Sequence, residues 1–340
     1  MALDPTAARI AVIIPARDAA RSLPACIDAL LREGVPGPNI KLIVVDDAST
    51  DETPKIAAAK GAVVLQGAGV GPAAARNLGA RHATGDVLIF LDADTAPQPG
   101  WLAALIAPFA DPAIVAVKGR YVTEQRGIVP RFSQLEFEEK YARLERAARI
   151  DFVDTGTAAY RSDVFLATGG FDESFPAQSA EDVELAFRLA EQGARFAFSP
   201  LARVRHTHAE SLFDYLHKKA RYGFFRVTVY RRHPTKLRGD SYTPPWMGMQ
   251  IILAALLPVT LLAAALRFPK WPSAVLAVAY VAGSMPLLRR AWVADRGLFP
   301  WVVPLSFARA FAQGLGLAHG LAVVVVQRHR ATSEQPRVER

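Results

Sequence analysis

Cysteine is nearly absent from this sequence. Its 340 residues include one, Cys26, so an intramolecular disulfide is excluded and a reducing compartment is favoured. Internal repeats and low-complexity tracts are absent as well. No signal peptide is recognised, because the only early apolar run, residues 10–16, is short and is typical of a strand. We therefore expect the N-terminal part to stay in the cytosol.

Charge is absent from two long runs. Residues 247–266 are twenty residues without a charge, and residues 271–288 are a second uncharged run of 18. At about 1.5 Å per residue, such runs can cross a hydrocarbon core about 30 Å thick. A third run, residues 298–327, is broken by Arg309 and His319. We expect a transmembrane region over 246–327 with two to three helices, at about 247–266, 271–288 and 300–326.

Tryptophan residues stand at the ends of these runs, where interfacial aromatics belong: Trp246, Trp271, Trp292 and Trp301. The alternative to membrane insertion is a set of buried helices in a soluble core. Runs of 18 or more uncharged residues favour lipid.

The net charge of +8 is concentrated ahead of the first apolar run. Residues 201–240 carry ten Lys or Arg and three Asp or Glu. This excess obeys the positive-inside bias and suits anionic lipid head groups, although part of it is an ordinary solvated helix face. Nucleic-acid binding is disfavoured because membrane segments accompany the basic residues. We expect a basic membrane-proximal helix at about 210–240.

The side of the membrane occupied by the polar tail, residues 328–340, depends on the third run. Three spans would place Arg328 and Arg330 outside, against the positive-inside bias. Two spans, or a third segment lying partly in the interface around Arg309, would keep the tail inside. The sequence leaves these alternatives open, and it leaves the oligomeric state unknown.

Residues 1–240 alternate strand-like and helical segments. Four runs rich in β-branched residues are separated by segments of helical composition, which predicts an α/β fold with a mostly parallel sheet and flanking helices. A Gly-rich irregular segment, residues 151–179, has the length of a functional loop region. The expected strands are 10–16, 41–47, 61–67, 85–92, 113–122 and 194–199, and later helices are expected at 129–149 and 180–192.

Two aspartates follow the fourth strand. If the backbone stays extended, Asp92 and Asp94 turn their carboxylates to the same side, at the strand edge where open α/β sheets bind ligands. Two such oxygens suit Mg²⁺ or Mn²⁺ bridging a diphosphate. The alternative is an ordinary turn.

The second strand also ends in acids, Asp46 and Asp47. These carboxylates could accept hydrogen bonds from a base or a ribose at the same edge, with Pro15 and Ala16 forming one wall. The alternative is local structure, because the following Ser49 and Asp51 are good helix caps.

Two further motifs have both a structural and a functional interpretation. Ser179 and Asp182 have the spacing of a capping box, yet Asp182 also follows the lid-like "GGFDESF" and could deprotonate a hydroxyl. His206 and His208 follow the last strand of this part. A lone histidine is usually structural, but His-x-His near Asp-x-Asp offers an imidazole to the same ion.

Gly67, Gly69 and Gly71 lie between a strand and a helix, which is also typical of a dinucleotide-binding turn. In that interpretation Asp92 would contact a ribose. Pro72 disagrees with it, because the fingerprint needs a small residue for close helix packing near that point.

Several segments taken together resemble family 2 glycosyltransferases in order and spacing, over residues 10–225. The resemblance implies a GT-A fold, a nucleotide-sugar donor linked to UDP, GDP or dTDP, a divalent Mn²⁺ or Mg²⁺, and inversion at the anomeric carbon. The segments are "VIIPARDAARSLPACIDALL", "VVDDASTDET", "AAARNLGA", "GDVLIFLDADT", "GGFDESF", "AEDVELAFRL" and "VRHTHAESL".

Carried over residue by residue, the resemblance implies three roles. Donor contacts are implied for Pro15, Ala16, Asp46, Asp47, Arg76, Asn77 and Asp92. Metal ligands are implied at Asp94 and His206, and the general base at Asp182. Weaker candidates are Glu181, Asp172 and His208.

The chain departs from the processive synthases of that family, which carry Q-x-x-R-W before their later membrane helices. Here "HKKARYGFFRVTVYRRH" has neither Gln nor Trp. We therefore expect transfer of a single sugar, by residues 1–240 on the cytosolic side of the cytoplasmic membrane, to a lipid or lipid-linked acceptor. Two alternatives remain, an NAD-dependent enzyme using the Gly67–Gly71 turn and a catalytically inactive membrane scaffold.

Overall fold

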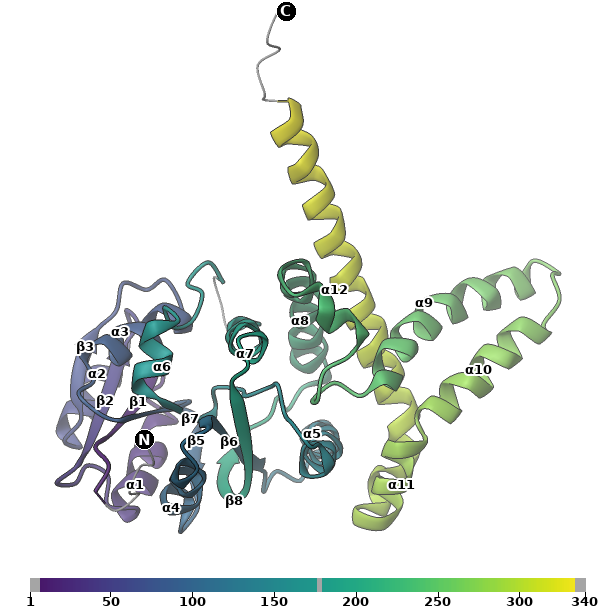
Figure 1. Ribbon diagram of the computed structural model, residues 1–340. Coiled ribbons are helices and arrows are strands. Elements are labelled where there is room, and N and C mark those ends of the chain that lie inside the picture. Colours follow the sequence, from purple (N-terminus) through teal and green to yellow (C-terminus); the bar gives the residue numbers. More distant parts are fainter. Residues whose placement is uncertain (1–6, 176–178, 334–340) are drawn as a thin grey trace, which may run out of the picture. The chain divides into compact units, whose positions relative to one another are not determined.

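The chain forms two compact units, each with its own core, in a computed structural model that describes residues 7–175 and 179–333 (Figure 1). The sheet unit comprises the residues up to 126 together with 136–208 and 240–242. The helical unit comprises 127–135, 209–239 and the residues from 243 onward. The basic segment after residue 208 therefore groups with the apolar helices.

The sheet unit is built on a mixed sheet with the order β3-β2-β1-β4-β7-β6-β8-β5. Strands β1 to β4 run parallel, β7 is antiparallel to β4 and β6, β8 is parallel to β6, and β5 is antiparallel to β8. The strands are β1 (Ile10–Ala16), β2 (Ile40–Asp46), β3 (Val63–Gln66), β4 (Val87–Leu91), β5 (Thr95–Pro97), β6 (Ile114–Val122), β7 (Thr157–Arg161) and β8 (Arg195–His206).

Helices flank this sheet (Figure 1). Helix α3 packs so closely on β1 that a Cβ atom at Gly79 would lie 2.5 Å from Cγ2 of Ile13. The helices of this part of the chain are α1 (Leu23–Arg32), α2 (Thr53–Ala59), α3 (Pro72–His82), α4 (Trp101–Ile106), α5 (Ile128–Arg146), α6 (Ser162–Ala167) and α7 (Glu181–Glu191), with a 3₁₀ turn at Ala107–Ala110.

The sequence predicted the parallel part of the sheet correctly and missed an antiparallel part. Strands β1 to β4 and β6 form where they were expected, and β8 begins where expected but runs on to His206 instead of ending at residue 199. The prediction of an irregular segment over 151–179 is wrong, since it contains β7 and α6. Strand β7 has five residues, all buried, and so shows no alternation of polar and apolar side chains.

The helical unit holds a basic helix followed by the apolar ones. The second expected span, 271–288, is divided by a bend of 48° near Ser284, where Pro286 lacks the N–H that a continuous helix would use. The helices are α8 (Leu212–Arg232), α9 (Pro245–Ala265), α10 (Trp271–Gly283), α11 (Met285–Ala294) and α12 (Phe299–Ser333), with 3₁₀ turns at Pro234–Arg238 and Arg296–Leu298.

Glycine allows α8 and α12 to touch at their backbones. A Cβ atom at Gly316 would lie 1.9 Å from the carbonyl oxygen of Ala220, and one at Gly320 would lie 2.6 Å from that of Phe224. A Cβ at Gly223 would in turn lie 2.3 Å from the carbonyl oxygen of Gln313. Both helices must separate if any of these glycines gains a side chain.

This packing predicts that Gly316→Ala destabilises the protein by about 1–3 kcal/mol, because the new methyl group meets backbone that cannot move alone. The matched control is Gly248→Ala in α9, where no heavy atom lies within 4 Å of the Cβ position. That variant is expected to be neutral or more stable by up to about 1 kcal/mol, since alanine favours helix. Thermal unfolding in detergent compares them, and equal midpoints would contradict the contact.

Candidate functional site

The predicted site residues lie at the carboxyl edge of the parallel strands. Pro15 and Ala16 end β1 and pair with Val45 and Asp46 of β2. Asp46 is 3% exposed, and within the described residues its Oδ1 has no hydrogen-bond partner. A buried acceptor without a donor costs free energy, so this oxygen is suited to a hydrogen bond from a ligand at the edge.

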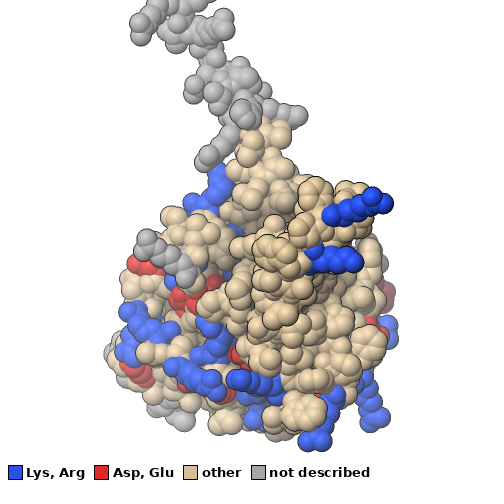
Figure 2. Space-filling model, turned by 90° about the vertical axis from the view of Figure 1, so that its right-hand side faces the viewer, with Lys and Arg blue, Asp and Glu red and all other residues tan. Residues whose placement is uncertain are grey.

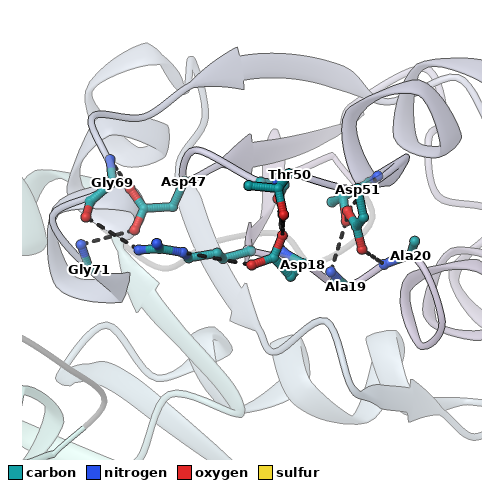
Figure 3. Close-up of polar contacts among 11 residues, drawn as sticks. Asp18, Ala19, Ala20, Asp47, Thr50, Asp51, Gly69 and Gly71 are labelled. Atoms are coloured by element: carbon teal, nitrogen blue, oxygen red, sulfur yellow. Dashed lines mark hydrogen bonds and ion pairs between the residues drawn. The ribbon is translucent and has the colours of Figure 1, made fainter.

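Asp47 holds the glycine loop that follows β3. Its carboxylate accepts the N–H of Gly69 at 2.8 Å and the N–H of Gly71 at 2.9 Å (Figure 3). The dinucleotide interpretation needs such N–H groups for a pyrophosphate. Because both donate to Asp47, the structure argues against that interpretation.

The loops after β1 and β2 are tied to each other. Asp18 accepts the backbone N–H of Thr50 at 2.8 Å, and Asp51 accepts that of Ala20 at 3.0 Å (Figure 3). Asp51 also accepts the N–H of Thr53, the first residue of α2, although the N-cap residue of that helix is Glu52 and its side chain makes no cap. Asp18 and Ala48 both have positive φ, at 48° and 61°. Strain of this kind persists only where neighbouring contacts hold the backbone, as these do.

Arg76 joins three elements of the site. Its guanidinium is 1% exposed and contacts Oδ1 of Asp92 at 2.8 Å and Oε1 of Glu181 at 3.0 Å. Arg76 lies on α3, Asp92 follows β4, and Glu181 begins α7. The sequence predicted Arg76 and Asp92 as donor contacts, and the structure shows them as partners in one buried ion pair.

The neighbouring Asn77 holds the chain that precedes α7. Its side-chain amide donates to the carbonyl oxygen of Phe171 at 2.8 Å, and its Oδ1 accepts the N–H of Phe171 at 2.9 Å. Asp172, a weaker base candidate, accepts the N–H of Ser174 at 2.8 Å. Residues 176–178 of the lid-like segment lie outside the described residues.

The capping box predicted as an alternative for Asp182 is not formed. Helix α7 begins at Glu181, and its N-cap, Ala180, has no side-chain cap. The backbone N–H of Ser179 donates to Oε2 of Glu181, while Oδ1 of Asp182 accepts the N–H of Val183. In a capping box the Asp182 carboxylate would accept the Ser179 N–H. Here Glu181 accepts it, while its other oxygen binds Arg76.

Asp182 titrates unlike an ordinary aspartate. Burial, and then the negative charges of Glu181 and Asp154, raise the pKa of Asp182 to about 8. The Val183 N–H and the positive charge of Arg76 oppose this rise without cancelling it. A carboxyl group with a pKa near 8 is mostly protonated at pH 7, and the carboxylate that forms at higher pH is a stronger base than that of an ordinary aspartate.

The backbone after β4 is a turn, so the expectation of an extended Asp-x-Asp is wrong. The N–H and the hydroxyl of Thr95 both donate to the carbonyl oxygen of Asp92, at 3.1 and 2.7 Å. This turn leaves Asp94 exposed while Asp92 is drawn toward Arg76. The alternation that holds for a strand therefore does not apply to the two carboxylates.

The two predicted metal ligands come from paired strands. Thr95, next to Asp94, pairs with His206 at the end of β8. Nδ1 of His206 lies 3.1 Å from Nδ1 of His208, and His208 also stacks on Phe137. Among the described residues, no group of three or more His, Cys, Asp or Glu side chains could hold an ion. A carboxylate and an imidazole fit Mn²⁺ or Mg²⁺ here only if the donor supplies further oxygens.

Sequence reasoning missed a buried cation beside this site. Lys118 of β6 is fully buried and pairs with Asp154, whose other carboxylate oxygen accepts the Tyr121 hydroxyl at 3.0 Å. The rings of Tyr121 and Tyr141 lie 5.2 and 5.5 Å from its ammonium group. Burial lowers the pKa of Lys118, and the charge of Asp154 opposes that shift. A lysine inside the apolar run "AIVAVKGRYV" was the available signal.

We expect Lys118→Met to cost about 3–5 kcal/mol of stability, because it leaves the Asp154 carboxylate buried without its cation. Replacing both partners, as in Lys118→Met with Asp154→Leu, is expected to recover much of that loss. The control is Lys55→Met, whose ion pair with Glu52 has side chains 77% and 65% exposed and contributes about 0–1 kcal/mol. Chemical denaturation measures all three, and a loss no larger than that of the control would refute the pair's importance.

The sequence was compared with those of known protein families and proteins. The sequence model described as "Glycosyl transferase family 2" matches residues 11–168. A pre-mycofactocin glycosyltransferase of Mycobacterium tuberculosis is 34% identical over 237 residues, 67% of this chain and 48% of the relative. This chain thus spans about half the length of that relative. The O-antigen chain rhamnosyltransferase RfbN of Salmonella typhimurium is 30% identical over 59% of this chain and 67% of the relative.

Solved structures show the same fold. The mannosyltransferase PcManGT of Pyrobaculum calidifontis, in complex with GDP-Man and Mn²⁺, matches 94% of this chain and 88% of its own with a TM-score of 0.61 at 22% identity. Glucosyl-3-phosphoglycerate synthase of Mycobacterium tuberculosis, with Mn²⁺ and UDP-glucose, matches 67% of this chain and 80% of its own with a TM-score of 0.50 at 23% identity. The predicted GT-A fold is confirmed.

Proposed function

The chain belongs to glycosyl transferase family 2, and we propose that it moves one sugar from a nucleotide-sugar donor to a hydroxyl group of an acceptor at a membrane face. The observation that carries the proposal is the ion pair of Arg76 with Asp92 and Glu181. It brings the donor edge of the sheet next to the helix that bears Asp182.

The donor is proposed to bind at the edge formed by Pro15, Ala16 and Asp46. The unpartnered oxygen of Asp46 supports a hydrogen bond from the base or the ribose. Solved neighbours were obtained with GDP-Man and with UDP-glucose, so the base of this chain's donor stays open among UDP, GDP and dTDP. Arg76 is proposed to act through Asp92, whose position it fixes.

Asp94 and His206 are proposed to hold Mn²⁺ or Mg²⁺ together with the donor diphosphate. Asp94 directly precedes Thr95, which pairs with His206, and this supports the assignment, as does the Mn²⁺ that accompanies the donor in the PcManGT structure. When bound, the ion would offset the negative charge that builds on the departing nucleoside diphosphate. His208, in contact with His206, is proposed to orient that imidazole.

Asp182 is proposed as the general base of a single displacement that inverts the anomeric carbon. It takes the proton of the acceptor hydroxyl while that oxygen attacks the sugar and the bond to the diphosphate breaks. Glu181 is less suited to this role, because its carboxylate is used by Arg76 and the Ser179 N–H. The raised pKa of Asp182 supports the assignment.

The acceptor is proposed to be a membrane lipid or a lipid-linked glycan. Candidate spans within the described residues support attachment to a membrane. The cytoplasmic membrane, with the sheet unit on its cytosolic side, agrees with the basic residues ahead of the first span. A scaffold that has lost catalysis remains the second candidate, since ligands in place do not prove turnover.

Asp182→Asn is expected to keep donor binding and to lose transfer by about 10²- to 10⁴-fold, because the amide cannot accept the proton. The assay measures nucleoside diphosphate released by detergent-solubilised protein from UDP-, GDP- and dTDP-sugars with Mn²⁺, with and without membrane lipid. Release by the unchanged protein is expected to rise with pH through about 8, where half of the Asp182 carboxylate has formed, and to level off above it.

The matched control is Asp163→Asn, an exposed acid of α6, which is expected to leave release unchanged. Transfer by Asp182→Asn near the unchanged rate would refute the base. Lack of release from every donor by the unchanged protein would favour the inactive scaffold.

For Asp94→Ala, we expect donor affinity in the presence of Mn²⁺ to fall by at least roughly tenfold, because an anionic metal ligand is lost. Titration calorimetry with a nucleotide sugar, with and without Mn²⁺, measures the change. Glu52→Ala removes another exposed carboxylate, which pairs with Lys55, and it is expected to have no effect. Equal affinities for Asp94→Ala and the unchanged protein would exclude Asp94 as a ligand.

A further inference from the structure

Three segments of the helical unit are apolar and long enough to cross a bilayer. They are α9, residues 296–326 with most of α12, and the pair α10 and α11 taken together across their bend. Within the described residues, length and composition alone therefore allow either two or three crossings. The contacts of α12 decide between them.

The middle of α12 lies against the backbone of α8. The glycine contacts of residues 313–320 with residues 220–224 leave no room for a lipid chain between the helices. His319 adds a ring contact with Phe224, at 5.0 Å between centroids. The two helices therefore share one environment, so α8 would lie in lipid if this part of α12 did.

Helix α8 is too charged for hydrocarbon. Residue 313 is the midpoint of the apolar run 300–326, so in a spanning α12 the contact with α8 would lie near the bilayer centre. Charged side chains are least favourable at that depth. The basic residues of α8 are Lys218, Lys219, Arg221, Arg226, Arg231 and Arg232.

Arg309 of α12 gives an independent indication of depth. Its guanidinium donates to Oε1 of Gln250 and lies 5.6 Å from the ring centroid of Trp246, which is in the first turn of α9. A tryptophan at the start of a span marks the membrane face. In a span beginning at residue 300, Arg309 would instead lie about 14 Å deep, near the middle of the hydrocarbon. The contact places Arg309 near the face at which α9 enters.

Helices α9 and α10 have the surface that lipid would cover. They run side by side to a connection far from α12, and the view onto this hairpin shows a largely uncharged surface (Figures 1 and 2). Exposed apolar side chains follow both helices, among them Val259 and Val278. Arg267 and Lys270 are exposed at the connection, where a full crossing would bring them to the opposite head groups.

We propose that the chain crosses the bilayer twice, through α9 and through α10 with α11, and that α8 and α12 lie together at the surface of the membrane. Five residues, 207–211, join β8 to α8, so this surface is on the same side of the membrane as the sheet unit. Leu315, Leu321 and Val325 are exposed on the part of α12 turned away from the glycines and enter the interfacial layer. Arg231 and Arg232, which are exposed at the end of α8, contact anionic head groups.

This proposal rests on the membrane attachment in the proposed function and is independent of catalysis. Carbonate extraction of membranes tests attachment first, and release of the protein by carbonate would overturn both. The topology is then measured by labelling single cysteines with a membrane-impermeant maleimide in sealed vesicles of either orientation. The background is Cys26→Ala, or the unchanged chain, since Cys26 is buried and burial raises the pKa of its thiol.

Three positions report the sides. Glu52→Cys marks the sheet unit, Pro269→Cys marks the connection between α9 and α10, and Ser333→Cys marks the end of α12. We expect positions 52 and 333 to be labelled from one side and position 269 from the other, each with at least tenfold preference. Labelling of 52 and 333 from opposite sides would overturn the placement of α12. Labelling of 269 from the same side as 52 would overturn the two crossings.

Discussion

The buried guanidinium of Arg76 is the constraint on which the site depends. An arginine cannot lose its proton inside a protein, so its charge must be balanced wherever it is buried. Asp92 and Glu181 balance it from two elements that are far apart in the sequence. Because the three groups must stay together, the end of β4 and the start of α7 are held at one distance. The position proposed for the donor and that proposed for the base are therefore fixed by the same interaction.

The acidic side chains of the site differ in their partners and therefore in the roles they can have. Both carboxylate oxygens of Asp47 accept N–H groups of the glycine loop, whereas Asp92 accepts a hydrogen bond from Arg76 through its Oδ1. Asp46 keeps a buried oxygen without a partner among the described residues, and Asp94 is exposed. Asp182 favours its proton because it is buried and lies near the negative charges of Glu181 and Asp154. Similar residue types thus receive distinct chemistry from their surroundings.

Local patterns in the sequence predicted more of the fold than of the site. Strands β1 to β4 are long apolar runs, so periodicity and composition identify them. Strand β7 is short and buried and pairs with residues far away in the chain, which no local pattern records. The same limit applies to Arg76, whose contact with Glu181 spans 105 residues. The motif order identified these residues as important, but only the structure shows that Arg76 holds acids in place.

Hydropathy, which is also a local property of the sequence, does not predict the surroundings of α12. A scan of composition treats each helix as if lipid surrounded it, yet the medium around a helix is set by its neighbours. Gly316 and Gly320 add little to the apolar character of α12, but they decide which helix can approach it. Once α8 touches that backbone, its lysines and arginines belong to the environment of both helices. A helix can therefore be apolar and long enough to span a bilayer and still lie at the membrane surface. It is held there by a charged helix that can pack against its glycines.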